Sequence, residues 1–235
     1  MRRSLIAIAS VAAIVVSMGG ALAWADDTGG GTNGKADAAA GPTADQLRDA
    51  VNGCDTQLSD GTYAEDEDGS SDIPVCKSSG GAVHWKADMD VDCDGQRTDQ
   101  CNEDTDPSWQ NETSFQQSDG QPLNAAALPF YVIPLPSDVW NYEDAGIDPG
   151  TVAAVVYQDK VVYAVFGDQG PDTIIGEGSY ALADALGIDP DPATGGVEGK
   201  AVDYILFPGV TADPIEDHDN ATSVGTDAAN KLVGA

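Results

Sequence analysis

The clearest apolar pattern in the chain is a pair of β-branched runs, 151–157 and 161–166, which are separated by three polar residues. Runs of this length predict two buried β-strands, and the short connection predicts that they pair as a hairpin. The second run stops at Gly167, so we expect Asp168 to project from the exposed end of its strand. The hairpin would then fix the position of that carboxylate.

A second carboxylate follows one turn later. Residues 169–172 have turn composition, and the apolar residues 174–176 lead to Glu177, nine positions after Asp168. Hydrolysis of a glycosidic bond needs one carboxyl group to protonate the leaving oxygen and another to activate water or to attack the sugar. The pair is a candidate for this chemistry, although such spacing is common by chance in a chain with 40 acidic residues.

The remaining pattern predicts short elements around this pair. They are a helix opened by a capping box at Thr43 and Gln46, a proline-bounded strand at 128–136 that is short or at a sheet edge, a helix at 179–186 that ends before Gly187, and a strand at 201–207 that ends at Pro208. The helix at 179–186 would place Glu177 at a helix N-terminus. The aromatic residues of the polar stretch 103–121, Trp109 and Phe115, are expected to pack against the domain.

The N-terminus has the pattern of an export signal. Arg2 and Arg3 precede an apolar run, and a small-x-small site ends at Ala25, which predicts a signal peptide with the export route left open. We therefore expect a secreted protein. The chain divides into a signal peptide at 1–25, a flexible linker at 26–41, a catalytic domain at 42–210 and a peripheral C-terminal tail at 211–235.

The chain contains four cysteines, an even number that favours two disulfides in an exported protein. Three pairings are possible, and we favour the sequence neighbours, Cys54 with Cys76 and Cys93 with Cys101. A zinc site is a poor alternative because no Cys-x-x-Cys spacing occurs and the two histidines are far apart in the chain.

An acidic segment lies between the cysteines. Asp90, Asp92 and Asp94 resemble the start of an EF-hand loop, but position twelve is Cys101 where calcium would need Glu. Calcium held in another geometry and a solvated acidic loop are both alternatives. We favour an acidic lip that attracts a cationic substrate, because opposite charge steers a ligand into a cleft.

Several segments together resemble the chitosanases of glycoside hydrolase family 75. They are 86–95 (KADMDVDCDG), 128–134 (LPFYVIP), 166–171 (FGDQGP), 175–182 (IGEGSYAL) and 189–197 (DPDPATGGV). The resemblance covers roughly residues 80–210 and implies endo-hydrolysis of chitosan with inversion, without a cofactor, by Asp168 and Glu177. Gly178 departs from the family pattern, in which we expect Ala.

Further roles are expected around the pair. We expect Gln169 and Asp172, in the turn between the two carboxylates, to contact substrate together with Asp90, Asp92 and Asp94. Desolvation at the strand end would make Asp168 the general acid, and the helix dipole would keep Glu177 ionised as the general base. Inversion requires the two carboxyl groups to lie roughly 6.5–9.5 Å apart, so that a water fits between them.

Composition limits the partners. A formal net charge of −30 disfavours nucleic acid, whose phosphates need Lys and Arg, and it suits the polycation chitosan as well as simple solubility. We expect a monomer that has no membrane span. The fold class is mainly β with short helices in a compact β-barrel; a double-psi topology rests on resemblance to other polysaccharide-cleaving barrels, and a lysozyme-like α+β fold is the alternative. The rival function is a non-catalytic acidic module that binds carbohydrate or calcium.

Overall fold

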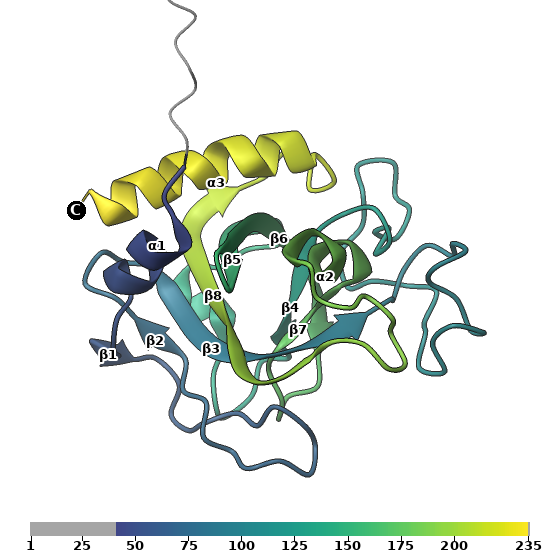
Figure 1. The fold of residues 1–235 in the computed structure, drawn as a ribbon, viewed down its shortest axis with the longest axis horizontal. Helices are drawn as coiled ribbons and strands as arrows, with labels where there is room; N and C mark the ends of the chain where they lie inside the picture. Colours follow the sequence, from purple (N-terminus) through teal and green to yellow (C-terminus); the bar gives the residue numbers. More distant parts are fainter. Residues whose placement is uncertain (1–40, 235) are drawn as a thin grey trace, which may run out of the picture. The chain divides into compact units, whose positions relative to one another are not determined.

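The structure is a computed structural model that describes residues 41–234. Its centre is a closed β-barrel of six strands (Figure 1). In their order around the barrel these are β3 (Val83–Asp92), β7 (Glu177–Ser179), β4 (Phe130–Pro134), β6 (Lys160–Gly170), β5 (Thr151–Tyr157) and β8 (Val197–Thr211). Pairing of β8 with β3 closes the barrel, so the expectation of a compact β-barrel is confirmed and the lysozyme-like alternative is set aside.

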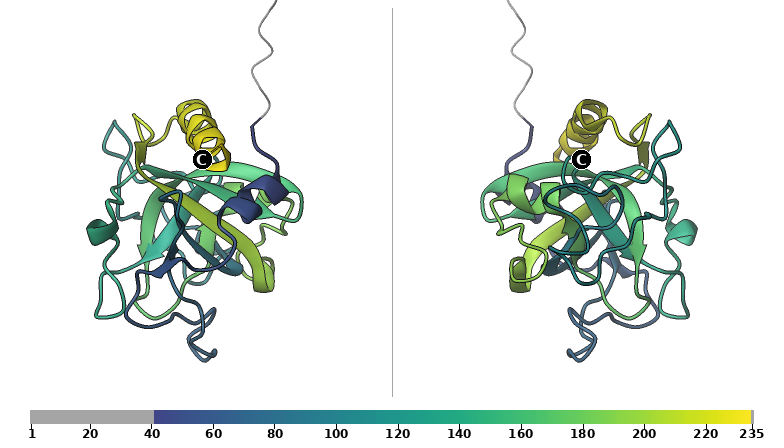
Figure 2. Two further views of the ribbon diagram at one scale, coloured as in Figure 1. Left: turned by 90° about the vertical axis from the view of Figure 1, so that its left-hand side faces the viewer. Right: turned by 90° about the vertical axis from the view of Figure 1, so that its right-hand side faces the viewer.

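Short elements surround the barrel. They are β1 (Thr56–Gln57) and β2 (Cys76–Lys77), which extend the sheet beside β3, the helices α1 (Ala44–Ala50), α2 (Tyr180–Leu186) and α3 (His218–Val233), and a 3-10 turn, η1 (Tyr142–Ala145). Figure 2 shows α3 lying across one side of the barrel, and α1 packs beside it.

β4 and β5 are buried on both faces, which explains their nearly uninterrupted apolar sequences. On β5, Ala153 and Val155 join the core inside the barrel, whereas Val152, Ala154 and Val156 join a second core outside it. This alternation follows from the period of two along a strand. The outer core is completed by α1 and α3, through side chains that include Leu47 and Leu232.

The predicted hairpin is confirmed. β5 and β6 pair antiparallel with Tyr157 opposite Lys160, so the turn consists of Gln158 and Asp159. Two helix predictions are also confirmed. α1 carries the capping box of Thr43 and Gln46, and α2 has Ser179 as its N-cap and the left-handed Gly187 as its C-cap.

The strand predicted within 128–136 to be short or at an edge is short, and two other strands continue beyond their predicted ends. β4 lies between β7 and β6. Pro134 occupies its last position, so the missing N–H of proline does not interrupt the hydrogen bonds within the strand. β8 continues past Pro208 to Thr211. β6 runs on to Gly170, so Asp168 lies within a strand, opposite Val132, and not beyond its end.

A bulge at Gly167 accounts for the last difference. The parallel pairing of β4 with β6 skips this residue, and a β-carbon on Gly167 would lie 2.6 Å from the Phe130 side chain. Only glycine fits here without moving its neighbour. A bulge redirects the side chain that follows it, and here that side chain is Asp168.

The C-terminal segment that we expected as a tail forms α3 and packs on the outer face of β5, β6 and β8. Its buried residues, Ala221, Ala229 and Leu232, belong to the outer core. Within residues 41–234, no helix has the length and apolar character that a membrane span requires. The expected signal peptide at 1–25, and the linker at 26–41 except for Gly41, lie outside the described residues.

Both predicted disulfides are present. Cys54 bonds to Cys76 and Cys93 bonds to Cys101. The first ties the segment after α1 to β2, and the second closes a short loop directly after β3. All four thiols are therefore in disulfides, which removes the cysteine ligands that a zinc site would have used.

Candidate active site

Asp168 is held on β6 by three hydrogen bonds to a single oxygen. The backbone N–H and the hydroxyl of Ser114 donate to Asp168 Oδ1 at 2.8 and 2.6 Å, and the Gln169 N–H donates to it at 2.7 Å. The side chain is buried, with 6 % of its surface exposed. Burial is the largest effect and raises the pKa of Asp168 above its usual value, and the three donors offset part of this rise because hydrogen bonds to the charged form favour ionisation.

Glu177 opens β7 and lies in register with Asp90 on the parallel strand β3. It precedes the N-cap Ser179 by two residues and so lies outside α2, which removes the helix-terminus environment that we expected for it. Among the described residues no hydrogen-bond donor reaches its carboxylate, which is affected only by burial and by neighbouring negative charges. Burial, followed by the charges of Asp90, Asp168 and Asp94, raises the pKa of Glu177 to about 7.

The acidic segment leads from the end of β3 into the same region. Asp92 Oδ1 accepts the Asp94 N–H at 2.7 Å, and Asp94 Oδ1 accepts the Gln110 N–H at 2.6 Å, so each carboxylate has a fixed direction. Burial raises the pKa of Asp92 well above its usual range, and the charges of Asp168 and Glu177 raise it further. Burial likewise raises the pKa of Asp94 to about 6.

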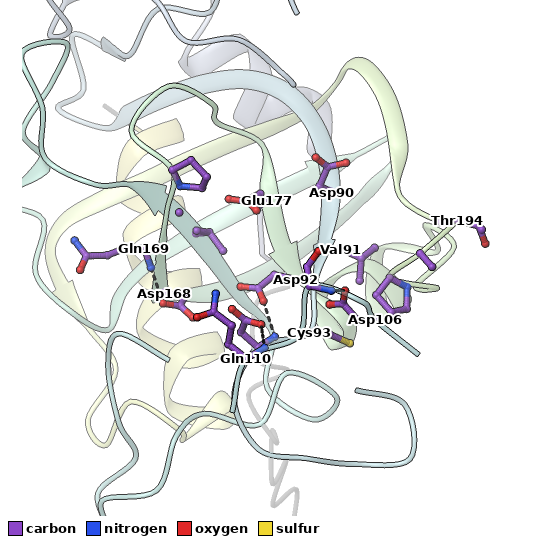
Figure 3. A pocket seen from close by; sticks show the side chains of 18 of the residues that line it. Asp90, Val91, Asp92, Cys93, Asp106, Gln110, Asp168, Gln169, Glu177 and Thr194 are labelled. Carbon is purple, nitrogen blue, oxygen red and sulfur yellow. Dashed lines mark hydrogen bonds between the residues drawn. The ribbon is translucent and has the colours of Figure 1, made fainter. Parts of the chain in front are cut away.

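These carboxylates share one cleft of about 750 Å³ (Figure 3). Seven acidic side chains line it, namely Asp90, Asp92, Asp94, Asp106, Asp168, Glu177 and Glu198. In the described part of the chain, no Lys, Arg or aromatic residue lines the same cleft. The cleft therefore concentrates negative charge that the protein itself does not neutralise, which suits a cationic ligand.

The structure brings most of the predicted site residues together. Gln169 lines the cleft, and its amide donates to the Tyr142 hydroxyl at 2.9 Å, which fixes the side chain. Asp172 is different, because it is exposed and is not among the residues that line the cleft. The turn at 171–173 carries it outward, away from the positions of Asp168 and Glu177.

Several cleft residues carried no signal in the sequence. Ser114 belongs to a long polar loop, and nothing in its neighbourhood marks it as the partner of a carboxylate 54 positions away. Asp106 and Glu198 are single acids in a chain that has 40. Leu135 is the one large apolar side chain in the described residues that is exposed, at 47 %, and it also lines the cleft. Trp109 and Phe115 pack against the cores as expected.

A cleft that gathers several carboxyl groups on a closed β-barrel supplies the side chains that glycoside hydrolysis requires. The family described as fungal chitosanases of glycosyl hydrolase group 75 matches residues 89–232, and the chain belongs to this family.

Curated relatives agree with this family. Endo-chitosanase C of Aspergillus oryzae is 34 % identical over 137 residues, which are 56 % of this chain and 33 % of that protein. An endo-chitosanase of the same species is 33 % identical over 138 residues, covering 54 % of this chain and 56 % of its own length. An endo-chitosanase of Aspergillus fumigatus is 28 % identical over 171 residues, or 68 % and 71 % of the two chains. The chain thus spans from one third to just over half of the first two relatives.

Proposed function

We propose that this chain is an endo-acting chitosanase that hydrolyses β-1,4 bonds between glucosamine units of chitosan with inversion. The observation that carries the proposal is the cleft, in which Asp168 and Glu177 lie among five further carboxylates and, in the described part of the chain, no Lys or Arg lines the same surface. Protonated glucosamine units supply the positive charge that such a surface attracts. The family membership and the names of the curated relatives support the same activity.

The hydrogen bonds favour Asp168 as general base and Glu177 as general acid, the reverse of the assignment expected from the sequence. Three donors stabilise the ionised form of Asp168, which would accept a proton from the attacking water. Glu177 is surrounded by negative charge and retains its proton close to neutral pH. It would donate this proton to the glycosidic oxygen as the bond to the anomeric carbon breaks.

The rest of the cleft would bind the sugar chain. Asp92 and Asp94 would face ammonium groups of glucosamine units, and Leu135 offers an apolar contact for the face of a ring. Acetylation removes the positive charge of a unit, so tolerance for acetylated substrate should be limited at the subsites that these carboxylates line.

We also propose that the protein is exported. The predicted signal peptide is one support, and the two disulfides are another, because such bonds persist in oxidising compartments.

Viscosity and reducing-end assays on chitosan test the activity. The wild type should lower viscosity early, and Asp168→Asn and Glu177→Gln should each lose at least about a hundredfold in rate. Asp172→Asn is the matched control, because the same change on an exposed carboxylate outside the cleft should leave the rate intact. Binding of chitosan by the wild type without cleavage would refute the proposal and favour the non-catalytic module.

A further inference from the structure

Three carboxylates from two distant segments meet at the side of the barrel. Asp88 and Asp90 lie on β3, and Asp66 lies in the acidic loop 64–72. One oxygen from each lies within 4.8 Å of the others. The group differs from the EF-hand-like trio considered from the sequence, because it shares only Asp90 with it and recruits a loop that the pattern did not single out.

The loop and the strand are held together by one segment, 173–176. Ala64 donates to the Thr173 carbonyl at 3.1 Å and accepts from the Ile175 N–H at 3.0 Å, while Asp90 donates to the Gly176 carbonyl at 2.8 Å. Tyr63 and Ile73 pair at the base of the loop, with N···O distances of 2.8 and 3.0 Å. The meeting of the three acids is therefore built into the backbone.

Asp88 gives an independent indication of a ligand. Its side chain is 3 % exposed, and its Oδ1 has no hydrogen-bond partner among the described residues. Gly176 lies against that oxygen, where a β-carbon would overlap it. A buried oxygen without a partner is costly to keep, and repulsion from Asp66 and Asp90 adds to the cost. A cation bound to the Asp88 carboxylate would remove this repulsion.

Among residues 41–234, no Lys, Arg or His side chain forms an ion pair with Asp66, Asp88 or Asp90. Lys200, which is close in space to the loop, forms its ion pair with Asp72 at 2.8 Å. Burial, followed by the charges of Asp90, Glu65 and Asp66, raises the pKa of Asp88 to about 8.

We propose that Asp66, Asp88 and Asp90 bind a calcium ion. Three carboxylate oxygens form a hard donor set, and calcium accepts the irregular geometry and additional water ligands that a loop and a strand edge provide. Magnesium is less suited, because it demands a near-ideal octahedron. The ion would tie loop 64–72 to β3, next to the position at which β3 pairs with Glu177. Asp90 would then be a metal ligand, and Asp92 and Asp94 would remain available to the substrate.

Calorimetry with calcium chloride on the chelator-treated full chain tests the site. We expect saturable binding of one ion and a rise in Tm that magnesium does not reproduce at equal concentration. Asp66→Asn should weaken calcium binding by about tenfold or more, because a charged ligand is lost. Asp68→Asn, a change of the same kind in the same exposed loop but outside the trio, should retain the wild-type affinity.

Asp88→Asn should abolish binding, and Asp66→Asn keeps the test decisive if the buried variant fails to fold. Lack of saturable calcium binding by the wild type would overturn the proposal, as would equal affinity in Asp66→Asn and the wild type. Preference for magnesium over calcium would overturn the identity of the ion.

Discussion

Gly170 faces Glu177 so closely that a β-carbon on Gly170 would overlap the Oε2 atom of the Glu177 carboxylate. Gly170 ends β6, the strand that carries Asp168, and Glu177 opens β7. The missing side chain at Gly170 therefore makes the room that the Glu177 carboxylate occupies in the cleft.

Gly170→Ala should consequently displace the Glu177 carboxylate and lower kcat by about a hundredfold, a loss typical of a misplaced catalytic group. The overlap is with the end of a flexible side chain, so Tm should change little. Gly61→Ala is the control, because its β-carbon would meet Val139 at an ordinary 3.6 Å and should affect neither quantity. Full activity of Gly170→Ala would mean that this position of Glu177 is not required.

Exogenous azide distinguishes the roles of the two carboxylates. Azide attacks without needing a base, so it should restore turnover to Asp168→Ala and yield a glycosyl azide of inverted configuration. Glu177→Ala should not respond to azide, but it should cleave a substrate whose leaving group needs no proton. Rescue of Glu177→Ala by azide would restore the opposite assignment of acid and base.

Glu177 should make the folded state less stable as pH rises. Its pKa is about 7 in the folded protein against an ordinary 4.5, so its favourable contribution is complete below pH 4.5 and is lost as pH rises through 7. The loss amounts to about 3 kcal/mol at pH 8, at 1.4 kcal/mol for each pKa unit. Glu177→Gln should therefore unfold at higher urea concentration than the wild type at pH 8, while the two should be similar at pH 4. Parallel pH dependences of the two proteins would contradict this account.

The two disulfides should differ in their effect on function. Removing either pair by Cys→Ala substitution should cost about 2–3 kcal/mol, because the unfolded chain gains freedom. Cys93 lines the cleft between Asp92 and Asp94, so loss of the Cys93–Cys101 bond should also lower activity. The Cys54–Cys76 pair lies outside the cleft that holds Asp168, and its removal should leave the rate per folded molecule unchanged. Urea unfolding and initial rates on chitosan measure the two effects separately.

Local signals predicted the local elements. The capping box at Thr43, the hairpin at 151–166 and the helix that Gly187 ends were all visible, because their determinants lie within a few residues of one another. The closure of β8 onto β3 was not visible in the pattern, since it joins segments more than 100 positions apart. The barrel was expected only by resemblance.

The candidate site divides in the same way. Asp168, Glu177 and the acidic segment could be proposed from types and spacing, and the structure places them in one cleft. The electrostatic environment of the pair could not be predicted from the sequence. It depends on Ser114 near Asp168 and on Asp90 near Glu177, and tertiary contacts bring both of these residues into place. Asp172 failed as a cleft residue for a related reason, since the direction of a side chain in a turn is not set by composition.

The outer position of α3 bears on how the enzyme can be shortened or fused. Gly225 lets the helix approach Tyr163 on β6 with no space for a β-carbon between them. A fragment that ends at residue 210 would lack α3 and would expose the apolar outer face of the hairpin that carries Asp168. Such a fragment would be prone to aggregate. Fusion partners and affinity tags are therefore better joined through linkers that leave α3 packed on the barrel.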